Sequence, residues 1–124
     1  MRETYRAFIR RFPKPSEDYF HARMLLMTEM LAAAVVAAGG PEPPAIAAAL
    51  EGMSIEQGGV AMHMRAADHQ VQTDLYLSMM ERAGSGGVEL DIEGSGYGFR
   101  TVAKLPAAAV SEPPECRMSR PVSR

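Results

Sequence analysis

In the first half of the chain, apolar residues recur at the three- and four-residue spacing of a helix. The first such series is Tyr5, Phe8, Ile9 and Phe12. Pro13 and Pro15 follow, and neither can continue a helix because proline lacks the backbone N–H and fixes φ. We therefore expect a short amphipathic helix that ends near Phe12.

A longer second helix is expected between Ser16 and Gly39. Ser16 is a suitable N-cap, and the acidic residues after it suit the positive end of the helix dipole. The apolar stripe expected to face the core is Phe20, Met24, Met27, Leu31 and Val35. A third helix should begin at Pro43 or Pro44 and close at Gly52.

The second half of the chain has the period-two alternation of half-buried strands. The two clearest series are Val60, Met62, Met64 and Val88, Leu90, Ile92. The range 71–80 is a third candidate strand, and the glycines of residues 84–87 indicate a turn. The pattern predicts an α/β domain with helices in its N-terminal half and strands in its C-terminal half.

The composition excludes several classes of function. The 124 residues are 47% hydrophobic, which is typical of one globular domain. Thirteen basic and fifteen acidic side chains are spread along the chain, so no basic surface for nucleic acid is expected. The longest apolar run, residues 30–38, is far shorter than the roughly 20 residues of a membrane span, so no membrane insertion is expected.

Candidate chemical groups are few. His63, Asp68 and His69 lie close together in the sequence, but their spacing matches neither HExxH nor a zinc ribbon. The favoured interpretation is a polar turn in which Asp68 accepts backbone N–H bonds. Cys116 is the only cysteine, and the GSGYG stretch at residues 94–98 lacks the dinucleotide-loop spacing. We predict no catalytic residue, no metal and no cofactor.

Several segments resemble the C-terminal part of the leucine or branched-chain amino acid binding proteins of ABC transporters, a family of type I periplasmic binding proteins. The first two are TYRAFIRRFPKPSEDYFHARMLLMTEMLAAAVVAAGG and PPAIAAALEGM. The others are MRAADHQVQTDLY, VELDIEGSGYGFRTVAKLPA and PPECRMSRP. MRAADHQ is the most specific of these strings.

The resemblance implies a non-catalytic fragment of an amino acid uptake protein. Residues 1–105 would form an incomplete lobe of a type I binding protein, and residues 106–124 a Pro-, Ala- and Ser-rich tail. By the same resemblance Tyr19 would line the ligand cleft, although a helix-start residue packed on a neighbour is an equal alternative. The full-length parent would bind an amino acid and an ABC permease.

The resemblance also implies a periplasmic location for the full-length parent. Residues 1–11 of this chain do not have the pattern of a signal peptide, so we expect the chain itself to remain cytoplasmic. An isolated partial lobe would expose sheet edges and apolar surface, and would self-associate.

Two other functions stay open on the sequence alone. One is a free-standing cytoplasmic interaction module with an unknown partner. The other is a small hydrolase that uses His69 and Asp68.

Overall fold

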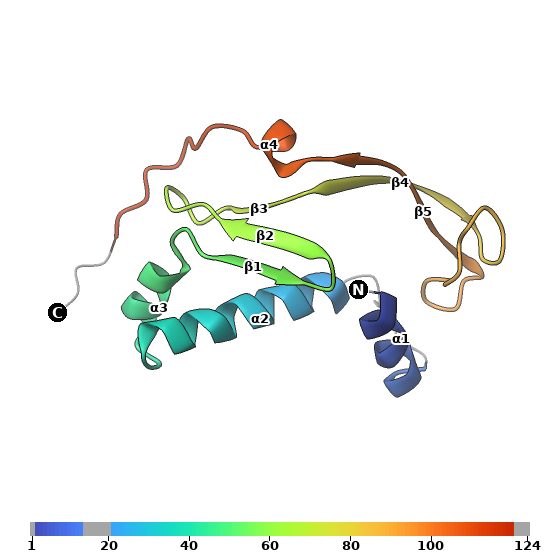
Figure 1. Cartoon of the computed structure of the whole chain (residues 1–124), viewed down its shortest axis with the longest axis horizontal. Coiled ribbons are helices and arrows are strands. Elements are labelled where there is room, and N and C mark those ends of the chain that lie inside the picture. The colour runs from blue at the N-terminus through green and yellow to red at the C-terminus, as the bar shows by residue number, and fades with distance from the viewer. Residues whose placement is uncertain (1, 14–20, 121–124) are drawn as a thin grey trace.

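The computed structural model describes residues 2–13 and 21–120, and it confirms the α/β class with helices first and strands second (Figure 1). The helices are α1 (Arg2–Arg11), α2 (His21–Ala38), α3 (Pro43–Leu50) and α4 (Ala107–Val110). The strands are β1 (Ser54–Gln57), β2 (Val60–Met64), β3 (Val71–Thr73), β4 (Leu75–Arg82) and β5 (Tyr97–Leu105).

The strands form two separate antiparallel sheets. β1, β2 and β3 make a three-stranded sheet in that order, and β4 and β5 make a ribbon of two strands that extends beyond it (Figure 1). Asp74 separates β3 from β4, so the strand predicted over residues 71–80 is two strands. The Asp74 carboxylate lies 2.6 Å from the Lys104 Nζ and accepts a 2.9 Å hydrogen bond from the Ala107 N–H.

The core lies between α2 and the three-stranded sheet. Leu26, Met30 and Ala34, spaced four residues apart, are buried on one face of α2. Leu26 and Met30 pack with Met62 and Met64 of β2, because alternate residues of a strand point to the same face. The core therefore consists of one face of α2 packed against one face of the three-stranded sheet.

The predicted core stripe of α2 is wrong at three of its positions, although its Val35 is half-buried. Met24, Met27 and Leu31 are 60%, 59% and 51% exposed, and Phe20 lies outside the described residues. The helix is apolar on nearly every side, so several stripes satisfy the helical spacing equally and periodicity does not identify the buried one. The sheet selects the stripe of Leu26 and Met30 and leaves another apolar face uncovered.

The strand predicted from Val88, Leu90 and Ile92 is also wrong, because these residues form a loop. Val88 is buried and its N–H donates to the Ser85 carbonyl oxygen, which closes the predicted glycine turn. Gly98 approaches this loop so closely that a Cβ there would lie 2.1 Å from the Leu90 carbonyl oxygen. In this loop Val88 is buried, whereas Leu90, Asp91 and Ile92 are all half-buried, and β4 takes β5 as its strand partner.

The short helix α1 ends as predicted, and it contacts the far end of the β4–β5 ribbon. Arg2 and Arg6 pair with the Glu89 carboxylate at 3.1 and 2.9 Å. The Tyr5 hydroxyl donates a 3.2 Å hydrogen bond to the Asp91 carbonyl oxygen. The two ends of the described chain thus lie on different parts of the molecule. α1 lies at the ribbon end, and the C-terminal segment returns to the side of α3 (Figure 1), where Arg120 contacts Glu51.

Within the described residues, no single helix is both long and apolar enough to cross a membrane. Only Ala22–Ala38 and Pro43–Leu50 together reach that length and composition, and they are bent by 112° at the break between them.

Replacing Met30 by alanine should destabilise the chain, whereas the same change at Met27 should not. Met30 is 2% exposed, so truncation leaves a cavity and should lower the free energy of unfolding by about 2–4 kcal/mol. Met27 is 59% exposed on the same helix, and its truncation should cost about 0.5 kcal/mol or less. Urea unfolding of the two variants measures both values, and equal losses would contradict this core.

Candidate functional site

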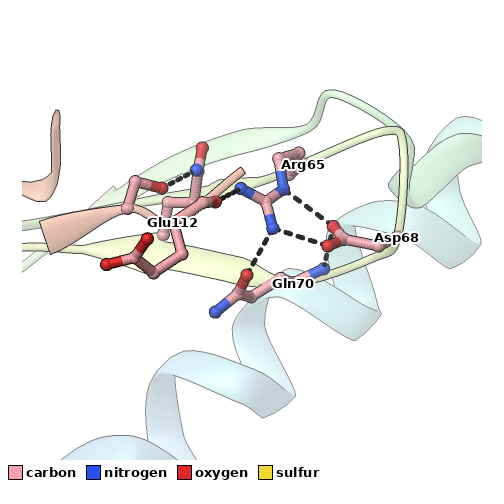
Figure 2. Close-up of polar contacts among 6 residues, drawn as sticks. Arg65, Asp68, Gln70 and Glu112 are labelled. Atoms are coloured by element: carbon pink, nitrogen blue, oxygen red, sulfur yellow. Dashed lines mark hydrogen bonds and ion pairs between the residues drawn. The ribbon is translucent and has the colours of Figure 1, made fainter. Parts of the chain in front are cut away.

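The most highly connected polar cluster lies at the turn between β2 and β3, within the MRAADHQ string (Figure 2). Arg65 donates to both carboxylate oxygens of Asp68, at 2.8 and 2.5 Å. The same guanidinium donates to the Gln70 side-chain oxygen at 2.5 Å and to the Glu112 carbonyl oxygen at 2.6 Å. One arginine thereby joins the turn to the C-terminal segment.

Asp68 is fixed in its ionised form by this arrangement. Its pKa falls from 3.8 to about 2, chiefly because the Arg65 side chain hydrogen-bonds to its carboxylate. Asp68 also accepts a 3.2 Å bond from the Gln70 N–H, as the polar-turn interpretation predicted. Its side chain is 10% exposed and both of its oxygens are engaged, so Asp68 has a structural role in this turn.

A second arginine ties the C-terminal segment to the other side of the turn. Arg120 donates to the Glu51 carboxylate at 2.5 Å and to the Ala66 carbonyl oxygen at 2.7 Å. The hydrogen bond from Arg120 lowers the pKa of Glu51. We call the contacts made by Arg65 and Arg120 to residues 51, 66, 68, 70 and 112 the clasp.

His69 lies beside the clasp in a left-handed backbone conformation, with φ of 56°. Its Nε2 is buried without a hydrogen bond among the described residues, and it lies 3.6 Å from the Glu51 carboxylate. The Asp68 oxygens are bonded to Arg65, so they do not orient His69 as a catalytic base. His69 and Asp68 therefore do not form the catalytic dyad that the hydrolase alternative requires.

His63 belongs to a different part of the molecule. It lies on β2, where its Nδ1 is 2.9 Å from the Ser54 hydroxyl oxygen of β1. Among the residues that the structure describes, no group of three or more His, Cys, Asp or Glu side chains could hold a metal ion. His63, Asp68 and His69 therefore do not converge on one site.

An open groove of about 420 Å³ lies along the three-stranded sheet. By strand alternation, Ser54 and His63 are on the face opposite the core residues Ile55 and Met62. The groove is lined by Ser54, Ile55, Glu56, Ala61, Met62, His63, Gln72, Asp74 and Ala107. No acidic side chain among the described residues is hydrogen-bonded to His63, so the Ser54–His63 pair lacks the third member of a catalytic triad.

Tyr19, the residue expected to line a ligand cleft, lies outside the described residues, so its role stays a prediction. The structural roles of Arg65 and Arg120 were not predicted from the sequence. The spacing of Arg65 and Asp68 was a possible local signal, whereas the contact between Arg120 and Glu51 joins residues 69 positions apart and has no local signature. Arg120 lies in the segment predicted to be a Pro-, Ala- and Ser-rich tail, and its contacts show that this segment returns to the β2–β3 turn.

Protonation of Asp68 should weaken the clasp at low pH. Its pKa is depressed in the folded state, so its stabilising effect is present above about pH 4 and is lost as the pH falls towards 2. An Asp68→Asn variant should therefore be less stable than the wild type at pH 7, and the difference should shrink as the pH approaches 2. Urea unfolding over this range measures it.

Glu115→Gln is the matched control for that experiment, because Glu115 is exposed and makes no ion pair among the described residues. Its stability should follow the wild type at every pH. A difference between Asp68→Asn and the wild type that stays constant with pH would contradict the role given to the carboxylate.

Comparisons with known proteins place the chain in a family. Residues 1–86, which include α1, the core, the clasped turn and β4, match the family model described as periplasmic binding protein. No curated protein matches the chain, and no solved structure matches it. Because the match covers more than half of the residues, the chain belongs to the periplasmic binding protein family.

Proposed function

We propose that the chain is the C-terminal part of a substrate-binding protein that captures branched-chain or related amino acids for an ABC permease. Residues 1–105 form part of one lobe, and residues 106–124 form a tail, of which the described residues 106–120 return to that lobe. Capture is non-catalytic and takes place in the periplasm, where the complete protein closes on its ligand and delivers it. The family match supports ligand binding, and the strings quoted above support the amino acid class.

The uncovered apolar face of α2 is the observation that supports an incomplete lobe. Met24, Met27 and Leu31 are more than half exposed, although they sit on the helix that forms the core. A helix that is apolar on all sides is normally buried on all sides. A second layer of structure over α2, supplied by other segments of the parent, would provide that burial.

The accessible surface of the chain supports the same proposal. The chain exposes 8927 Å², whereas a compact monomer of its 13.4 kDa exposes roughly 6500 Å². The excess is of the order expected for surfaces that are covered in a larger assembly. The isolated chain should therefore self-associate.

The tail contributes to the lobe through side-chain contacts. The Gln72 side chain of β3 donates to the Ser111 hydroxyl, Arg65 donates to the Glu112 carbonyl oxygen, and Arg120 donates to the Ala66 carbonyl oxygen. Residues 107–112 thus run beside β3, which is an edge strand of the sheet. A segment that covers an edge protects it from pairing with other chains.

Selective binding should require the complete protein, because the cleft of a two-lobed binding protein uses groups from both lobes and closes by a hinge. We expect leucine, isoleucine or valine to raise the melting temperature of the longer polypeptide that contains this chain, whereas glutamate should not. At a hundredfold excess over Kd the stabilisation is about 2.7 kcal/mol. The isolated chain should show no such shift.

Tyr19→Ala in the longer polypeptide should weaken amino acid binding, since we propose that this aromatic ring lines the cleft. Tyr76→Ala is the matched control, because Tyr76 lies half-exposed on β4, in the ribbon. Isothermal titration calorimetry of both variants measures the effect. Equal affinity in the two variants would remove Tyr19 from the site, and the absence of binding by any amino acid would remove the proposed function.

A further inference from the structure

His69 has a buried ring nitrogen that the clasp leaves without a partner. Within residues 2–13 and 21–120, the His69 Nε2 is the buried side-chain nitrogen or oxygen that makes no hydrogen bond. The backbone holds the residue in place, because the His69 N–H donates to the Arg65 carbonyl oxygen at 2.9 Å. A buried polar atom without a partner is unfavourable, so this ring has an interaction still to make.

The Glu51 carboxylate is the group placed to make that interaction. Its Oε1 lies 3.6 Å from the His69 Nε2. The same oxygen already accepts the 2.5 Å hydrogen bond from the Arg120 Nε. Side chains from the β2–β3 turn and from the tail therefore converge on a single oxygen atom.

The charges of the clasp are balanced only while His69 is neutral. Arg65 and Arg120 face the carboxylates of Asp68 and Glu51. Both Asp68 oxygens are bonded to Arg65, so Glu51 is the carboxylate left to neutralise a charge on His69. Glu51 stays ionised, because the hydrogen bond from Arg120, and after it the charge of His69, hold its pKa below 4.5. A protonated His69 adds a third cation to two carboxylates.

We propose that protonation of His69 transfers Glu51 from Arg120 to His69 and releases the tail beyond Glu112. Arg120 is the cation that leaves, because its side chain is 53% exposed and water can solvate it. The imidazolium is 25% exposed and is held by the turn, so it needs the carboxylate as its partner. Arg65 still holds the Glu112 carbonyl oxygen, which confines the release to the residues after it.

The release belongs to a different pH range from the weakening of the clasp at Asp68. Histidine side chains change charge between about pH 5 and pH 8. The tail is therefore held at pH 8 and released as the pH falls to 5. The pKa of Asp68 is about 2, so its carboxylate remains ionised throughout this range.

Cys116 provides a direct measurement, because it is the only cysteine, it is exposed and it lies in the released segment. A nitroxide label attached to it reports the mobility of the tail by electron paramagnetic resonance. Between pH 8 and pH 5 the ratio of mobile to immobile label should rise about fivefold, the factor expected for the loss of one partly exposed ion pair. Arg120→Gln should show at pH 8 the spectrum that the wild type reaches at pH 5.

His69→Asn should keep the tail immobile at both pH values, since it removes the third cation. Asparagine tolerates the left-handed backbone of this position, where φ is 56°, so the turn persists. His63→Asn is the matched control, because His63 lies on β2 beside Ser54 and not in the clasp. This variant should retain the full transition, and circular dichroism at both pH values should show an unchanged fold in all variants.

A wild-type spectrum that is the same at pH 8 and pH 5 would overturn the proposal. So would a transition that persists in His69→Asn or disappears in His63→Asn. The experiment uses no amino acid ligand, so its failure leaves the proposed binding function untouched, and loss of amino acid binding would leave the release of the tail untouched.

Discussion

The packing of α2 on the three-stranded sheet is the interaction on which the other parts of the structure depend. Leu26 and Met30 meet Met62 and Met64 there, and the partly buried Leu50, Met53, Ile55 and Val60 surround them. Sulfur-containing, unbranched side chains fill irregular spaces well, which suits a contact between a helix and a short, twisted sheet. This contact fixes the position of the β2–β3 turn and hence of the clasp.

The clasp links this core to the end of the described chain without adding to the apolar contacts. Arg65 and Arg120 satisfy backbone carbonyl oxygens as well as carboxylates, so each arginine orders a segment that has no ladder partner of its own. Guanidinium groups suit this role because they present several donors in a fixed plane. The specific MRAADHQ string thus has a structural explanation, with Arg65 and Asp68 holding the turn.

The ends of α1, α2 and α3 could be predicted from the sequence because proline and glycine follow them, whereas α4 was not predicted and the predicted N-cap Ser16 lies outside the described residues. The buried face of α2 could not, because its alanine-rich sequence is apolar all round and the choice of face is made by the sheet. The alternation at Val88 and Leu90 predicted the burial of Val88 correctly and strand structure wrongly, since a strand also needs a partner, and β5 already occupies that place. The clasp contacts of Arg65 with Glu112 and of Arg120 with Glu51 and Ala66 join residues distant in the sequence, and local patterns contain no information about them.

The proposed function requires the exposed face of α2 to be an internal surface of a larger binding protein. Methionine oxidation by hydrogen peroxide, followed by peptide mass spectrometry, measures the exposure of the methionines on this surface, because exposed thioethers react faster than buried ones. In the isolated chain, Met24 and Met27 should oxidise readily while Met30 and Met62 are protected. In the longer polypeptide all four should be protected, and rapid oxidation of Met24 and Met27 there would contradict the account.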